Sequence, residues 1–166
     1  MNAIKYEIRD MQPGEKYILK DMLYEAIFQP DESNLLPREV IQQPEINVYI
    51  DNFGREDDHC FVADVNGKIV GVVWVRILAG EIKGFGNIDN ETPEFAISLF
   101  KEYRNKGIGT DLMIKMINYL LEKGYKQTSL SVAKNNYALK LYEKLGFKIV
   151  KEQDEDYLMV LKLGEV

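Results

Sequence analysis

The spacing of apolar and polar residues predicts the elements of the first third of the chain. Apolar and polar positions alternate over residues 4–9, as they do in a strand with one buried face. A helix is expected over residues 13–28, because proline is favoured in a first helical turn and Pro30 ends the pattern. Residues 29–59 combine short apolar clusters with three prolines, which predicts short helices and loops.

A β-hairpin is predicted in the middle of the chain. Residues 60–78 form two runs rich in Val and Ile on either side of Asn66-Gly67, a pair that accommodates the positive φ of a tight turn. Residues 79–92 contain three glycines among acidic residues, which indicates a loop that could line a site. Another strand is expected over residues 93–100.

The last third predicts helices and strands in alternation. Apolar residues fall on one helical face from Ile108, and Gly124 stands where a C-terminal cap belongs. A strand over 127–132, a helix over 135–146 and two strands over 147–163 follow. The whole order is strand, helices, three strands, helix, strand, helix and two strands, which predicts a mixed α/β sheet with helices packed on it.

Length and composition favour one globular domain over residues 1–166. A chain of 166 residues is too short for two domains that each bury a sizeable core. Its 46% apolar and 29% charged content is that of an ordinary globular domain. Cys60 is the only cysteine, so an internal disulfide or a multi-cysteine metal site is excluded, and no metal is expected. His59 precedes it, but neighbouring strand residues point to opposite faces, which favours Cys60 as a small core residue.

The charge balance restricts the partners. The formal net charge of -6 opposes binding to nucleic acid or to an anionic membrane, and it weakly favours a cationic substrate. The first residues lack a signal-peptide pattern, and no apolar run is long enough to span a bilayer. We therefore expect a cytoplasmic protein.

The stretch Arg104-Asn105-Lys106-Gly107-Ile108-Gly109 places two glycines and two cations directly before a helix. Glycines allow backbone N–H groups to converge on an anion, and a helix N-terminus adds partial positive charge. A nucleotide-binding P-loop needs Lys-Ser or Lys-Thr after its second glycine, whereas Thr110-Asp111 stands here. A dinucleotide fingerprint requires a third glycine where Leu112 stands, so that alternative is strained.

The remaining pattern, R-x-x-G-x-G, resembles the acetyl-CoA-binding motif of the GNAT superfamily of N-acetyltransferases. A second motif of that family, N-x-x-A-x-x-L-Y-x-x-x-G-F, is similar to the stretch from Asn135 to Phe147. The resemblance covers roughly residues 60–163 and implies a mostly antiparallel sheet of about seven strands with helices on both faces. It also implies acetyl-CoA as the acetyl donor, with its pyrophosphate on residues 104–110 and its pantetheine arm beside Ile97 and Leu99.

The resemblance further implies direct attack of a primary amine on the thioester, through a tetrahedral intermediate. Tyr142 occupies the tyrosine of the second motif and is expected to protonate the leaving thiolate, although plain packing is the alternative. Glu94 is the leading general base, with Asp89 and Glu91 as alternatives. Asn135 is expected to cap its helix, contact the cofactor, or both. The N–H of Leu99 is expected to donate to the oxyanion.

The acceptor pocket is expected in the N-terminal half, where core packing is the alternative for every candidate wall. The candidates are Tyr24, Phe28, Leu35 and Leu36, while Trp74 is expected in the core. The acceptor is a small-molecule or peptide amine. A non-catalytic acyl-CoA-binding regulatory module and a dinucleotide-binding protein remain as alternative functions, and a homodimer paired through strand edges near the C-terminus remains open.

Overall fold

A single seven-stranded sheet organises the chain in the computed structural model, which describes residues 3–164. The strand order is β1-β2-β3-β4-β5-β7-β6, and every neighbouring pair is antiparallel except β4 and β5. The strands are β1 (Glu7–Asp10), β2 (His59–Val65), β3 (Lys68–Arg76), β4 (Glu94–Leu99), β5 (Gln127–Ala133), β6 (Lys148–Glu152) and β7 (Asp156–Lys162).

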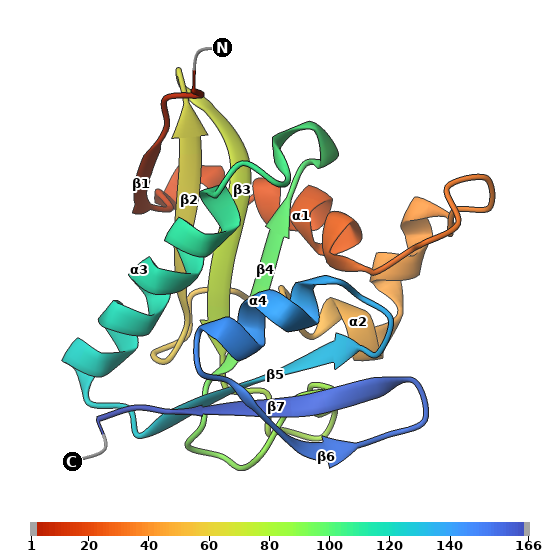
Figure 1. The fold of residues 1–166 in the computed structure, drawn as a ribbon, viewed down its shortest axis with the longest axis vertical. Coiled ribbons are helices and arrows are strands. Elements are labelled where there is room, and N and C mark those ends of the chain that lie inside the picture. Colours follow the sequence, from red (N-terminus) through yellow and green to blue (C-terminus); the bar gives the residue numbers. More distant parts are fainter. Residues whose placement is uncertain (1–2, 165–166) are drawn as a thin grey trace.

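Helices cover both faces of this sheet. On one face lie α3 (Ile108–Lys123) and α4 (Ala138–Lys144), and on the other lie α1 (Ile18–Ala26) and the short helix α2 (Pro44–Asn47) (Figure 1). Three 3₁₀ turns complete the helical elements: η1 (Pro13–Glu15), η2 (Arg38–Gln42) and η3 (Lys101–Tyr103). The predicted mixed sheet with helices on both faces is confirmed.

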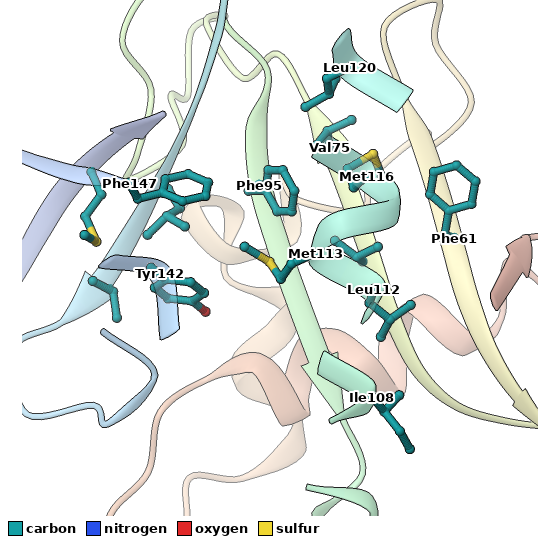
Figure 2. Packing of buried hydrophobic residues seen from close by; sticks show 14 of the residues in the cluster. Phe61, Val75, Phe95, Ile108, Leu112, Met113, Met116, Leu120, Tyr142 and Phe147 are labelled. Atoms are coloured by element: carbon teal, nitrogen blue, oxygen red, sulfur yellow. The ribbon is translucent and has the colours of Figure 1, made fainter. Parts of the chain in front are cut away.

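Alternation along β3 divides the core into two layers. Val73 and Val75 face α3, while Trp74 faces α1 and α2. The buried face of α3 carries Ile108, Leu112, Met113, Met116 and Leu120, packed over β2, β3 and β4 (Figure 2). Burial of this apolar stripe holds α3 on the sheet and thereby fixes the position of its N-terminus.

The hairpin and the helix ends follow the local sequence signals. Asn66 and Gly67 both have positive φ, at 51° and 88°, as a tight turn between twisted strands requires. Gly124 ends α3 with φ 84°, which confirms the predicted C-terminal cap. Cys60 is buried on the α1 face while His59 stacks on Tyr119 of α3, so the two neighbours do point to opposite faces.

Three boundaries differ from the prediction. The helix expected over residues 13–28 is a 3₁₀ turn followed by the shorter α1, and the first strand begins at Glu7 rather than Ile4. The helix expected over 135–146 begins at Ala138, because the Asn136 side chain accepts the Ala138 N–H at 2.9 Å. Asn135 is therefore not the cap, and it is exposed. The homodimer through the edge strand β6 stays a prediction.

Candidate active site

The parallel pair β4 and β5 opens into a V at the middle of the sheet (Figure 1). The two strands are paired only at Glu94 and Ser129, after which they diverge. The Phe100 N–H donates to β3 at Val70 O, so by alternation the N–H groups of Ile97 and Leu99 point into the opening. Because β4 pairs with β5 only at Glu94 and Ser129, no described strand is paired with β4 on the side of these two N–H groups, which leaves a strand edge free for a guest.

A cavity of about 770 Å³ occupies this opening. Its walls come from β4, β5, the end of α1, α2, α4, the loop before β4 and the turn between β6 and β7. Glu94 and Ile97 line it from β4, Tyr142 lines it from α4, and Phe28 lines it from the end of α1. The site thus combines residues that are far apart in the sequence, and most of them lie on regular elements.

Glu94 is the first residue of β4 and is only 3% exposed. Its Oε2 accepts hydrogen bonds from the Tyr49 hydroxyl and from the Gly86 N–H at 3.1 Å, while its Oε1 is buried without a partner among the described residues. Burial raises the pKa of Glu94 from 4.5 to about 7, although these two hydrogen bonds act in the opposite direction. A carboxyl with such a pKa can accept a proton near neutral pH.

Two glycines of the loop before β4 pack directly against this carboxyl. A Cβ added at Gly84 would lie 2.1 Å from Glu94 Oε1, and one added at Gly86 would lie 2.9 Å from the β5 backbone. Close approach therefore requires glycine at both positions, which explains why a glycine-containing loop lines the site.

We expect Gly84→Ala to reduce kcat by about 10- to 100-fold without unfolding the protein. The new methyl group would displace the Glu94 carboxyl, and small displacements of catalytic groups cost rate steeply. Gly80→Ala in the same loop is the matched control, because nothing lies within 4 Å of its added Cβ. Steady-state kinetics and thermal unfolding of both variants measure the effect. Equal kcat in the two variants would contradict it.

Tyr142 reaches the opening from the face of the sheet that α3 and α4 cover, opposite the face covered by α1 and α2. It is 9% exposed, packs 6.1 Å from the Phe147 ring, and points its hydroxyl from α4 toward the strand that carries Phe95 (Figure 2). Burial raises the pKa of Tyr142 to about 12, so the phenol stays protonated at neutral pH. Its hydroxyl donates to no other described residue and is available to a guest in the cavity.

The loop between β4 and α3 presents a row of backbone donors. Asn105 and Gly107 adopt positive φ, at 61° and 86°, and Gly107 is the N-cap of α3. None of the N–H groups of residues 105–110 donates to another described residue, and the α3 N-terminus adds partial positive charge. A loop of this kind is suited to an anion such as a pyrophosphate.

The two cations of the loop are placed differently. Arg104 donates from Nε to Leu99 O at 3.1 Å and from Nη2 to Glu25 of α1 at 3.4 Å, so it ties the end of β4 to α1. Lys106 is exposed beside the row of N–H groups. Lys106 is therefore the side chain of this pair that is free to follow a bound anion.

Several predicted residues lie outside the cavity lining. Asn135 is exposed, and its neighbour Asn136 lines the cavity instead. Asp89 and Glu91 are exposed in the loop before β4, where Asp89 O accepts from Asn87 Nδ2 at 2.9 Å. The acceptor and oxyanion candidates outside the lining are Leu99, Tyr24, Leu35 and Leu36, and the pyrophosphate candidates 104–110 form the separate loop described above. Trp74 is buried, as expected, although its side chain also borders the cavity.

Neither Tyr49 nor the acidic turn between β6 and β7 was predicted as part of the site. Tyr49 lies in the irregular stretch 29–59, where no periodicity singles it out, and it reaches Glu94 only because the chain folds back across β3. Asp154 and Glu155 of this turn and Asp156 at the start of β7 line the cavity, although the sequence pattern predicted only two strands over 147–163. Charge in a turn between strands is ordinarily a solubility feature, so the pattern alone does not distinguish the two.

The fold and this site define an acyltransferase class, and the comparison with known families agrees. The model of the "Acetyltransferase (GNAT) family" matches residues 21–147. The chain therefore belongs to the GNAT acetyltransferase family and is a GNAT-type N-acetyltransferase.

Relatives and solved structures are consistent with this assignment. An N-alpha-acetyltransferase of Sulfurisphaera tokodaii is 30% identical over 129 residues, which are 69% of this chain and 75% of that protein. N-alpha-acetyltransferase 30 of Homo sapiens is 29% identical over 84% of this chain, but the match spans only 38% of the human protein. The chain likewise spans less than half of an uncharacterized N-acetyltransferase of Methanocaldococcus jannaschii.

The fold recurs at lower identity. A PaiA N-acetyltransferase of Thermoplasma acidophilum, solved in complex with coenzyme A, is similar with a TM-score of 0.69 at 21% identity, covering 95% of this chain and 99% of that chain. The ribosomal-protein-S18-alanine N-acetyltransferase of Escherichia coli has a TM-score of 0.68 at 18% identity, covering 98% and 96%.

Two kinds of feature are absent from residues 3–164. No group of three or more His, Cys, Asp or Glu side chains there is arranged to hold a metal ion. Within the same residues, no helix has the length and apolar character needed to cross a membrane.

Proposed function

We propose that the protein transfers an acetyl group from acetyl-CoA to a primary amine. The observation that carries the proposal is the continuity of three features: the free N–H groups of residues 105–110, the unpaired edge of β4, and a cavity bordered by Glu94 and Tyr142. Acetyl-CoA has three parts in the same order. Its diphosphate fits the anion site, its extended amide-containing arm fits the strand edge, and its thioester fits the acid–base site.

The chemistry follows from the groups around the cavity. An alkyl ammonium has a pKa of roughly 10, so it must lose a proton before it attacks, and Glu94 is the base. The neutral amine attacks the thioester carbonyl to form a tetrahedral oxyanion, and its collapse expels the coenzyme A thiolate. Tyr142 donates its proton to that sulfur.

The Ile97 N–H suits the oxyanion better than the Leu99 N–H proposed from the sequence. Leu99 is five steps along the strand from Glu94, about 17 Å at ~3.3 Å per residue, whereas Ile97 is three steps and about 10 Å from it. Ile97 also borders the cavity, while Leu99 is outside its lining. A donor fixed in a strand needs no reorganisation as charge develops.

Charge around the cavity supports a cationic acceptor. Glu94, Asp154, Glu155 and Asp156 line it, and the described lining includes no Lys, Arg or His. Opposite charge in a cleft attracts and orients a substrate. Since relatives at about 30% identity are named N-alpha-acetyltransferases, peptide α-amines are the first acceptors to test, with small polyamines next.

The test is amine-dependent release of coenzyme A thiol from acetyl-CoA. We expect acceleration by a peptide with a free α-amine and none by the same peptide with that amine blocked. Binding of acetyl-CoA with no acceleration by any amine would favour a non-catalytic acyl-CoA-binding module. Absence of coenzyme A binding, or preference for NAD in competition, would overturn the proposal.

Tyr142→Phe should lower kcat by about 100-fold while the Kd for acetyl-CoA stays within twofold. The substitution removes only the proton donor, and the phenyl ring keeps its packing against Phe147. Tyr137→Phe is the matched control, because that tyrosine is 63% exposed and lies outside the cavity lining. Single-turnover kinetics isolates the chemical step. Unchanged turnover of the Tyr142 variant would remove this residue from the mechanism.

A further inference from the structure

Tyr49, near the end of the irregular N-terminal stretch, is built into the site through its hydroxyl. Its Oη donates to Glu94 Oε2 and accepts the Phe85 N–H at 2.8 Å. Its ring lies nearly parallel to that of Phe85, with centroids 6.3 Å apart, and it lines the cavity together with Glu94. The residue therefore connects the cavity to the buried carboxyl.

The backbone that carries Tyr49 is held by side chains of β3. Trp74 Nε1 donates to Tyr49 O at 2.9 Å, and Arg76 Nη1 donates to Val48 O at 2.9 Å and to Asp51 O at 2.8 Å. Arg76 is 2% exposed and is paired with Asp58 at 3.0 Å. A segment without regular structure is thus fixed over β3 at the position where the Tyr49 hydroxyl meets Glu94.

A substrate amine has little direct access to the carboxylate oxygens of Glu94. Its Oε1 is buried against Gly84, where an added Cβ would lie at 2.1 Å, and it has no partner among the described residues. Its Oε2 already accepts from Tyr49 and from the Gly86 N–H. Arg76, at the register position opposite Glu94, is committed to Asp58 and backbone carbonyls rather than to Glu94. Tyr49, which lines the same cavity, therefore offers through its hydroxyl a path for a proton to Glu94 Oε2.

We propose that Tyr49 is a catalytic residue that relays the proton of the acceptor ammonium to Glu94. In one concerted step the substrate N–H bond breaks as its proton bonds to Tyr49 Oη, and the Tyr49 O–H bond breaks as its proton bonds to Glu94 Oε2. The products are a neutral amine, a neutral tyrosine and a protonated Glu94, so charge and protons balance. The inference rests on the proposed acetyl transfer.

The properties of the two groups suit a concerted step. A phenol hydroxyl can donate one proton while it accepts another, and the Phe85 N–H leaves Oη able to take one further partner. Burial and the neighbouring charge of Glu94 both raise the pKa of Tyr49, which disfavours a free phenolate. Because burial raises the pKa of Glu94 to about 7, the proton ends on a group that can hold it and later return it to solvent.

Tyr49→Phe is the decisive variant, because it keeps the ring and the backbone carbonyl that Trp74 binds and removes only the relay atom. We expect kcat to fall about 100-fold, the rise of kcat near pH 7 to disappear, and the Kd for acetyl-CoA to stay within twofold. The remaining activity should increase with pH toward the pKa of the amine itself. Tyr125→Phe is the matched control, since Tyr125 donates to Asp57 at 2.6 Å outside the cavity lining.

The outcomes separate this inference from the proposed function. Turnover by the wild type together with unchanged kcat in the Tyr49 variant would overturn the relay and leave acetyl transfer intact. A lower kcat with the rise near pH 7 still in place would also overturn it, because Tyr49 would then act only on structure. If no amine accelerates thiol release by the wild type, the relay is overturned together with the proposed function. ¹³C NMR titration of Glu94 provides a readout without turnover, and an unchanged pKa in the variant would show that the two groups are not coupled.

Discussion

Replacing Glu94 by Gln should reduce kcat by about 1,000-fold and leave the Kd for acetyl-CoA within twofold. Gln has nearly the same shape, can still accept from Tyr49 and Gly86, and cannot take up a proton. A positioned base contributes about 100- to 10,000-fold, which sets the size of the effect. Steady-state kinetics with the preferred amine and calorimetry with coenzyme A measure the two quantities separately.

The pH dependence of kcat provides a second test of Glu94 as the general base. Because burial raises the pKa of Glu94 to about 7, wild-type kcat should increase with pH around 7 as the carboxyl ionises. This rise should be absent in the Gln variant. A variant that retained both its rate and its profile would assign the base to another group, such as a water relay from Asp89 or Glu91.

The Glu94→Gln variant should be at least as stable as the wild type, so a lower kcat would not result from unfolding. A carboxyl whose pKa rises on folding binds more protons in the folded than in the unfolded state between about 4.5 and 7, so the wild type loses stability as the pH rises through that window. The loss amounts to about 3 kcal/mol at most. A neutral amide avoids it, and the variant should unfold at an equal or higher temperature than the wild type at pH 8.

Local patterns predicted the parts of the fold that local physics determines. The α3 stripe, the Asn66-Gly67 turn and the Gly124 cap each depend on residues close together in the chain, and all three were predicted. The boundary of α4 was predicted incorrectly because two adjacent asparagines compete for one capping role, and only the folded backbone selects Asn136.

The site was predictable only where a motif is contiguous. Residues 104–110 form one turn and a helix start, so their spacing indicates an anion site before any folding is known. The Glu94 environment is assembled from Tyr49, Gly84 and Gly86, which meet only when the chain crosses β3 and returns into β4. Burial at that meeting point changes the pKa of Glu94, and no sequence spacing encodes it.

Gly109→Asp should weaken coenzyme A binding by about 10- to 100-fold while the fold remains as stable as the wild type. Gly109 lies in the first turn of α3, and an added Cβ would be 3.5 Å from Leu99, which is ordinary contact. A carboxylate there interacts favourably with the helix N-terminus, worth about 0.3–1 kcal/mol. The same charge would repel a pyrophosphate by up to about 4 kcal/mol for unit charges 4 Å apart at an effective dielectric constant of about 20. Solvent screening of this loop reduces the expected loss to about 1.4–2.8 kcal/mol, which is the 10- to 100-fold change in Kd.

Gly109→Asn isolates this charge effect, because Asn has the same shape and no charge. The difference in Kd between the Asp and Asn variants should shrink as salt rises, since exposed charges are screened. Isothermal titration calorimetry at low and high salt, with thermal unfolding in parallel, measures both. Equal affinities at low salt would show that no anion binds at the start of α3 and would leave the row of N–H groups at residues 105–110 without the ligand proposed for it.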